Sequence, residues 1–155
     1  MSGLPARHAR ALEALLEAFT DIDRPWALTG STSFALQGVS IDPDDIDIQT
    51  DRHAASQMSD ILNDHCIEPL SYRSSPAIRS WLGRFEIEGV EVEIIGNIER
   101  RGDGGWVGPV AIEDHRMTVP WRGYTVPVLD LEYEAEAYAQ LGRSDRAELL
   151  RDHID

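Results

Sequence analysis

The fold is decided by residues 26–50, which read WALTGSTSFALQGVSIDPDDIDIQT. The apolar run at 26–29 predicts a short buried strand that leads into Gly30-Ser31. Residues 32–37 predict a helix ending at Gly38, and the loop that follows contains Pro43. The alternation in residues 45–50 predicts a second strand. The segment therefore predicts a strand, helix and strand in succession.

Two carboxylates of the second strand share one face. Side chains two apart in a strand point the same way, so Asp45 and Asp47 project together while the isoleucines between them enter the core. A third carboxylate can come from the later strand at residues 90–95, which carries Glu91 and Glu93. Acidic groups this close either bind a metal ion or retain a proton. The pattern therefore predicts a metal site built from three carboxylates.

The Gly30-Ser31 turn gives these carboxylates a chemical context. A helix that begins at such a turn exposes free backbone N–H groups, which favour phosphate. Carboxylates that hold Mg²⁺ beside a phosphate are typical of phosphoryl or nucleotidyl transfer. Two alternatives are a solvated acidic strand edge and a calcium loop. A calcium loop counted from Asp42 would place Ile46 at position 5 and would lack glycine at position 6.

The rest of the chain predicts more helices and strands around this unit. Helices are expected at 6–20, 51–62, 131–141 and 145–154, and a short strand at 67–72. Hairpins are expected at 85–95 and 117–128, turning at Glu88-Gly89 and Arg122-Gly123. Residues 100–109 are expected to form a loop. The fold class is therefore α/β, with a small mixed sheet flanked by helices and with two C-terminal helices.

Length and composition limit the remaining choices. A chain of 155 residues with 42% hydrophobic residues favours one globular domain over residues 1–155. No apolar run approaches the roughly 20 residues that span a bilayer, so no membrane association is expected. Cys66 is the single cysteine, which excludes a disulfide framework. We expect a soluble, cytoplasmic protein.

The charge is strongly acidic. Asp and Glu total 28 against 14 basic residues, all of them arginine, for a formal charge of −14. Such a charge repels itself at low salt and is screened at molar salt, where the Debye length is about 3 Å. Acidic chains without lysine resemble the proteins of extreme halophiles, which predicts a halophilic source. No basic stripe is present to neutralise phosphates, so broad nucleic-acid binding is not expected.

The order of these motifs resembles the signature of the DNA polymerase β-like nucleotidyltransferase superfamily. That signature is an apolar residue, Gly, and Gly or Ser, then a spacer and an Asp-apolar-Asp/Glu pair. The resemblance implies that Ser31 and nearby amides hold the terminal phosphates of an NTP such as ATP. It also implies that Asp45 and Asp47 bind two Mg²⁺ ions. Glu93 best matches the third acid, with Glu91 as the substitute, although the family more often has Asp there.

The C-terminal region is similar to the helices of small antibiotic-type nucleotidyltransferases. Those usually carry a lysine near an Arg-x-x-Asp segment, and this chain has none. The resemblance therefore implies that Arg143, or else Arg146, takes the phosphate-facing role. Arginine keeps the positive charge but differs from lysine in geometry and hydration.

Two functions from different classes follow. The first is an enzyme that transfers an NMP group from an NTP to a hydroxyl of a small molecule or a protein. The second is a binding module with the same fold that acts as the antitoxin-like partner of a separate helical toxin. The small size of the chain leaves little room for a separate acceptor domain, which is the reason for keeping the second function.

Overall fold

The computed structural model describes residues 4–154 of the chain. Residues 1–3 and Asp155, which the predicted domain includes, lie outside the described residues. The helices are α1 (Ala6–Ala18), α2 (Gly30–Leu36), α3 (Arg52–Ile61), α4 (Leu131–Gln140) and α5 (Ser144–Ile154). The strands are β1 (Trp26–Thr29), β2 (Ile46–Thr50), β3 (Cys66–Ser74), β4 (Ile78–Ile87), β5 (Val90–Gly102), β6 (Gly105–Val107), β7 (Arg116–Trp121) and β8 (Tyr124–Leu129). Within residues 4–154, no helix is long and apolar enough to cross a bilayer.

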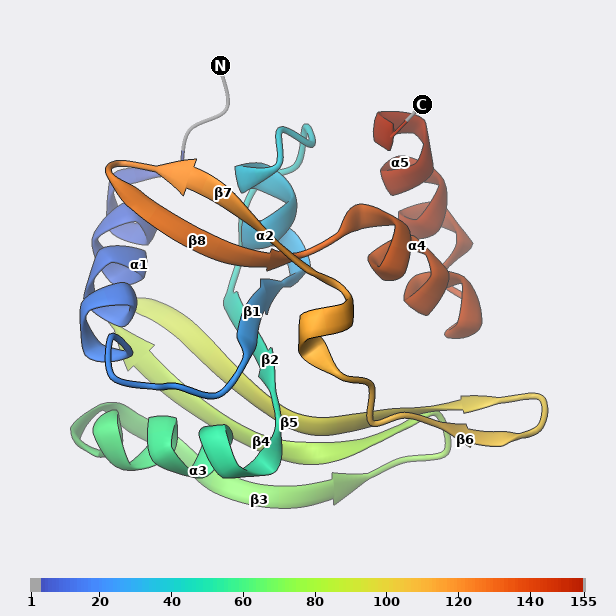
Figure 1. The fold of residues 1–155 in the computed structure, drawn as a ribbon, viewed down its shortest axis with the longest axis horizontal. Coiled ribbons are helices and arrows are strands. Elements are labelled where there is room, and N and C mark those ends of the chain that lie inside the picture. The colour runs from blue at the N-terminus through green and yellow to red at the C-terminus, as the bar shows by residue number, and fades with distance from the viewer. Residues whose placement is uncertain (1–3, 155) are drawn as a thin grey trace.

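The strands form one mixed sheet with the order β3-β4-β5-β2-β1-β8-β7, and β6 extends from β5. The pairs β2–β5 and β1–β8 are parallel, and the other pairs are antiparallel. Figure 1 shows α1 on one side of the molecule and α4 with α5 on the other. The predicted α/β class with C-terminal helices is therefore confirmed, with a sheet that is mostly antiparallel.

Strand β2 lies near the middle of the sheet, between β1 and β5. Its alternation works as the sequence predicts, because Ile46 and Ile48 are fully buried in the main core. Helix α1 packs Leu12 and Leu15 into the same core. Burying such aliphatic side chains contributes roughly 1.5–3 kcal/mol each. The core thereby fixes β2, and the opposite face of β2 is left for polar side chains.

Both predicted hairpins are present. Ile87 pairs with Val90 across Glu88-Gly89, and Trp121 pairs with Tyr124 across Arg122-Gly123. The two central residues of each turn have positive φ, as a two-residue turn matching the strand twist requires.

The loop prediction for residues 100–109 is wrong over much of its length. Strand β5 continues to Gly102 and pairs with β6 across Asp103-Gly104. Asp-Gly between two strands is itself a hairpin signal, which the surrounding glycines obscured. The guanidinium groups of Arg79 and Arg101 lie over the Trp106 ring, at 4.3 and 5.5 Å from its centroid. The contact from Arg79, which lies on β4, ties the β5–β6 hairpin to the rest of the sheet.

A second small core joins the C-terminal helices to α2. Phe34 and Val39 pack there against Ala135 of α4 and Leu150 of α5. This contact packs α4 and α5 against α2, the helix that begins at Gly30 (Figure 1). Side chains from the end of the chain therefore reach the predicted site.

Candidate active site

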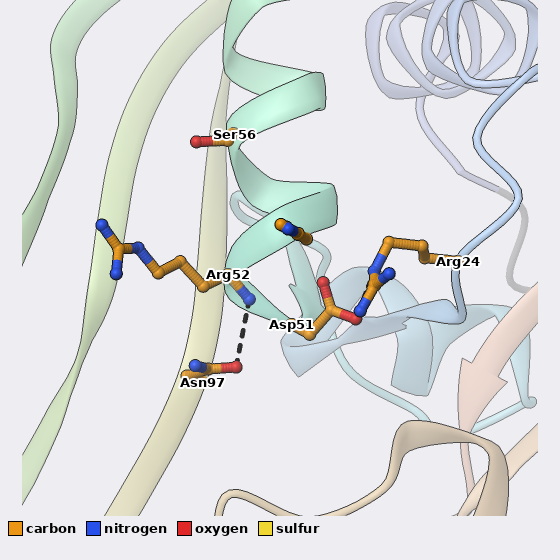
Figure 2. A pocket seen from close by; sticks show the side chains of 6 residues that line it. Arg24, Asp51, Arg52, Ser56 and Asn97 are labelled. Carbon is orange, nitrogen blue, oxygen red and sulfur yellow. Dashed lines mark hydrogen bonds and ion pairs between the residues drawn. The ribbon is translucent and has the colours of Figure 1, made fainter.

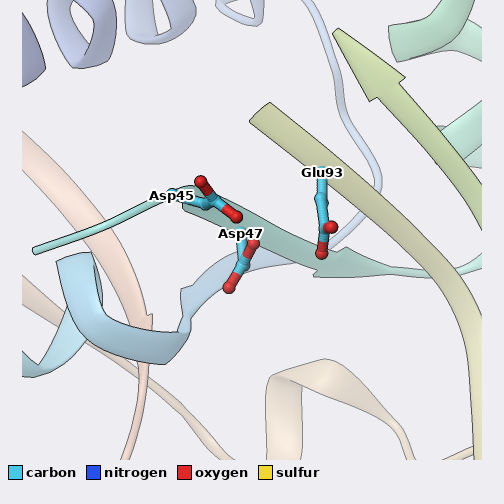
Figure 3. A group of neighbouring side chains, drawn as sticks. All are labelled: Asp45, Asp47 and Glu93. Carbon is cyan, nitrogen blue, oxygen red and sulfur yellow. The ribbon is translucent and has the colours of Figure 1, made fainter. Parts of the chain in front are cut away.

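Three carboxylates meet where β2 begins. Asp47 of β2 stands opposite Glu93 of β5 in the parallel register, and Asp45 directly precedes β2. One oxygen from each of the three side chains lies within 4.8 Å of the others. Figure 3 shows Asp45 and Asp47 on one strand and Glu93 on its neighbour. The structure therefore brings together the three residues that the sequence singles out, here called the acidic triad.

The position of Asp45 is set by the helix before it. Thr32 donates its hydroxyl to the Asp45 carbonyl at 2.8 Å, and Ser31 Oγ accepts the N–H of Asp44 at 2.9 Å. Two residues of α2 thus hold the loop that leads into β2. Replacing either hydroxyl would free the backbone that carries Asp45.

Gly30 allows the Gly-Ser turn to approach the triad. Its φ is +75°, in the left-handed region, and a Cβ at this position would lie 2.5 Å from Asp47 Oδ2. Any larger residue would therefore be strained and would displace the Asp47 carboxylate. The first residue of the motif is glycine because the carboxylate occupies the space of a side chain.

Burial and mutual repulsion raise the pKa values of the three triad carboxyls. Burial, and then the charges of Glu93 and Asp45, raise the pKa of Asp47 to about 8. Burial, followed by repulsion from nearby acids, also raises the pKa of Glu93 and of Asp45. Asp47 Oδ1 is buried without a hydrogen-bond partner among residues 4–154. A bound cation would coordinate that oxygen and favour the charged form of all three groups.

Glu91 is held away from this role by an arginine. Arg84 bonds both Glu91 and Glu68, and its bond to Glu91 lowers the pKa of Glu91. The charge of Glu91 still raises the pKa of Asp45, so Glu91 affects the triad through electrostatics. Of the two candidates for the third acid, the structure joins Glu93 to the aspartates and pairs Glu91 with Arg84.

A buried acid from α4 accepts hydrogen bonds from the turn that carries Gly30. Glu134 is 3% exposed and accepts hydrogen bonds from the Thr29 hydroxyl and the Gly30 N–H. Burial raises its pKa to about 7, although these bonds and Arg100 oppose the shift. Glu134 therefore ties the C-terminal helices to the turn that carries Gly30.

Two cavities share Gly30, Asp47 and Tyr138 in their walls. The first, the Ser31 cavity, has a volume of ≈ 270 Å³. Its lining is polar and comprises Gly30, Ser31, Ile41, Asp42, Asp44, Asp45, Asp47, Tyr138 and Arg146. The second, the Gln49 cavity, has a volume of ≈ 260 Å³. It is lined by Thr29, Gly30, Asp47, Gln49, Ile78, Ile95, Ile98, Arg100, Glu134, Ala137, Tyr138, Leu141 and Arg143.

The predicted nucleotide-binding residues divide between these cavities. Ser31 lines the Ser31 cavity together with Arg146, Arg143 lines the Gln49 cavity, and Gly30 lines both. The structure therefore places Arg146, the predicted alternative to Arg143, in the same cavity as Ser31.

A larger cavity of ≈ 460 Å³ lies at the other end of β2, where α3 begins (Figure 2). Several of its polar groups already have partners. Asp51 pairs with Arg24 at 2.8 Å and caps α3 by accepting the Ala54 N–H at 2.8 Å. Asn97 accepts the Arg52 N–H at 3.0 Å. These contacts anchor the start of α3, so we assign this cavity a structural role.

Comparison with known families agrees with this geometry. The family model described as aminoglycoside-2''-adenylyltransferase matches residues 11–154. The chain belongs to this family. Its membership confirms the resemblance to nucleotidyltransferases. Among curated proteins, no sequence matches the chain.

Solved structures share the fold of this family member. A crystal structure of a candidate nucleotidyltransferase from Thermotoga maritima has a TM-score of 0.87 and 37% identity, covering 98% of this chain and 95% of that one. The lincosamide antibiotic adenylyltransferase LnuA, bound to lincomycin, has a TM-score of 0.60 at 15% identity, covering 96% and 97%. ANT(2'')-Ia, in complex with adenylyl-2''-tobramycin, has a TM-score of 0.58 at 14% identity, covering 93% and 87%. The last two similarities show the fold alone.

Sequence reasoning missed several residues around the triad in this adenylyltransferase-family chain. Gln49 could have been found, because it continues the alternation of Asp45 and Asp47 on β2. Glu134, Tyr138 and Arg100 could not, because nothing in the local sequence shows that they approach β1 and β2.

Proposed function

We propose that this chain transfers an NMP group, from ATP or another NTP, to a hydroxyl of a small-molecule acceptor. The observation that carries the proposal is the acidic triad beside Ser31 and Arg146 in a member of an adenylyltransferase family. The relatives whose structures contain lincomycin or adenylyl-tobramycin act on or bind small molecules, which supports a small-molecule acceptor over a protein. Neither the comparisons nor the geometry supports the antitoxin-like role.

The triad residues fit Mg²⁺ by their chemistry. Mg²⁺ prefers oxygen ligands, and Asp45, Asp47 and Glu93 offer carboxylate oxygens within 4.8 Å of one another. The unpartnered Asp47 Oδ1 is a further sign of a ligand at this point among the described residues. Two Mg²⁺ ions held here would polarise the transferred phosphoryl group and stabilise the departing pyrophosphate.

The chain's own residues bind the nucleotide and manage the proton. Ser31 and Arg146 hold the terminal phosphates in the Ser31 cavity, and Arg143 approaches from the Gln49 cavity. The acceptor oxygen forms a bond to the α-phosphorus while the bond from that phosphorus to the bridging oxygen breaks, which releases pyrophosphate. Glu93, whose pKa is raised by burial, takes the proton of the attacking hydroxyl.

Incubation with an α-labelled NTP, Mg²⁺ and candidate acceptors at high salt tests this function. We expect label on a small-molecule acceptor, and no label with Asp45→Asn or Asp47→Asn. These variants should also lose Mg²⁺-dependent nucleotide binding. Unchanged nucleotide binding in both variants, or labelling of a co-purifying protein alone, would contradict the assignment.

A further inference from the structure

The Gln49 cavity contains polar groups that the transfer mechanism does not use. Gln49 is the third member of the alternating set on β2, after Asp45 and Asp47. Its side chain is 1% exposed, and Nε2 has no hydrogen-bond partner among residues 4–154. A buried amide donor without a partner costs stability, so a ligand that accepts its hydrogen bond is the simplest reason for its place in a cavity wall.

A second donor lies in the same wall. The Nε of Arg100 is buried and also lacks a partner within the described part of the chain. The other end of that guanidinium is fixed, because a terminal nitrogen donates to the Tyr133 hydroxyl at 3.0 Å. Gln49 and Arg100 thus give the cavity wall two N–H donors that no described residue satisfies, which suits an occupant with oxygen or nitrogen acceptors.

The remaining walls are mostly apolar. They are formed by Ile78, Ile95, Ile98, Ala137 and Leu141. A volume of ≈ 260 Å³ falls below the roughly 300–1,000 Å³ of pockets for drug-sized ligands. The occupant, or the part of it that enters, is therefore small and has apolar surface.

The charges of the cavity disfavour a polycation. Among its described lining residues the carboxylates are Asp47, which belongs to the triad, and Glu134, which already accepts from Thr29 and Gly30. Arg100 and Arg143 add two positive charges. A polycationic aminoglycoside would have to desolvate its ammonium groups beside these arginines without free carboxylates to pair with them.

The position of the cavity assigns it to the acceptor. In phosphoryl transfer the attacking and leaving oxygens lie roughly in line across the phosphorus. Given the proposed function, pyrophosphate leaves toward Ser31 and Arg146 in the Ser31 cavity. The attacking hydroxyl then enters through the Gln49 cavity, which borders Asp47 together with Gln49 rather than with Asp45.

We propose that the Gln49 cavity binds the acceptor, and that this acceptor is a small, uncharged hydroxyl compound with apolar surface. Gln49 and Arg100 donate hydrogen bonds to its oxygen atoms and orient the attacking hydroxyl toward the triad. This inference rests on the proposed nucleotidyl transfer and sets the chain apart from a relative whose structure contains adenylyl-tobramycin.

Ligand-observed NMR titrations of the full chain test the inference. The probes are 4-hydroxybenzyl alcohol and phenyl β-glucoside as uncharged hydroxyl compounds, tobramycin as the polycation, and adenosine. We expect the uncharged probes to bind and to bind about tenfold more weakly to Gln49→Leu, which lacks one hydrogen bond. Tobramycin should not compete with them, and Gln57→Leu, at an exposed position on α3, should behave as wild type.

Two further measurements separate a binding role from a structural one. The Tm of Gln49→Leu should equal or exceed that of wild type, because the variant removes a buried donor that has no partner. A lower Tm would indicate that Gln49 serves packing. Affinity for Mg²⁺ with a non-hydrolysable ATP analogue should be the same in both proteins.

Other outcomes would overturn the inference. These are failure of both uncharged probes to bind, Gln49-dependent binding of tobramycin, or Gln49-dependent binding of adenosine, which would make the cavity a nucleoside site. If the ATP analogue does not bind while the uncharged probes still require Gln49, nucleotidyl transfer fails and the binding chemistry of the cavity stands.

Discussion

The affinity of the acidic triad for Mg²⁺ should depend steeply on pH. In the metal-free protein, Asp47 retains a proton up to a pKa of about 8. Mg²⁺ binds the charged carboxylate, so that proton must leave first. At pH 6, two units below the pKa, this release costs about 2.7 kcal/mol, since each unit corresponds to about 1.36 kcal/mol. The apparent affinity should therefore be about a hundredfold weaker at pH 6 than above pH 8.

The free energy of unfolding should also depend on pH through the Asp47 proton. The unfolded chain releases it near the ordinary Asp pKa of 3.8, whereas the folded protein holds it to about 8. The folded state thus binds more protons in this window, and stability without metal falls as the pH rises through it. Added Mg²⁺ should raise Tm more at pH 8 than at pH 6.

Isothermal titration calorimetry with Mg²⁺ at pH 6, 7 and 8 measures the affinity, and a pair of buffers with different ionisation enthalpies counts the protons released. Asp60→Asn, which alters an exposed acid on α3, is the matched control and should follow wild type. An affinity that does not change between pH 6 and 8, or full Mg²⁺ binding by Asp47→Asn, would refute the reasoning.

Three further predictions concern stability. Gly30→Ala should lower the free energy of unfolding by about 1–2 kcal/mol, because alanine is strained in the left-handed backbone region, and should weaken Mg²⁺ binding by displacing Asp47. Gly104→Ala is the control, because no atom lies within 4 Å of the added carbon, and it should change neither quantity. Chemical denaturation measures the first quantity and calorimetry the second. Glu134→Leu should cost about 1–3 kcal/mol in urea unfolding, because the Thr29 hydroxyl loses its buried acceptor, whereas Glu134→Gln keeps an acceptor and should cost less. Tm should rise between low and molar KCl as screening weakens the repulsion of a −14 charge, and a flat response would exclude halophilic behaviour.

The sequence by itself determined the features that depend on local backbone geometry. The two-residue period of a strand places Asp45, Asp47 and Gln49 on one face and buries Ile46 and Ile48. The turns at residues 88–89 and 122–123 follow from the same local rules. These features hold because side-chain alternation and turn conformation are set within a few residues of the chain.

The tertiary structure decided what depends on contacts between distant segments. Glu91 and Glu93 share a strand face, and only the parallel register of β5 with β2 and the Arg84 pair separate their roles. Arg146 lines the same cavity as Ser31, and Glu134 accepts a hydrogen bond from Thr29. Both placements arise because α4 and α5 pack on α2 through the second core. The alternating pattern of β2 therefore specifies a pair of carboxylates, and long-range packing completes the site around it.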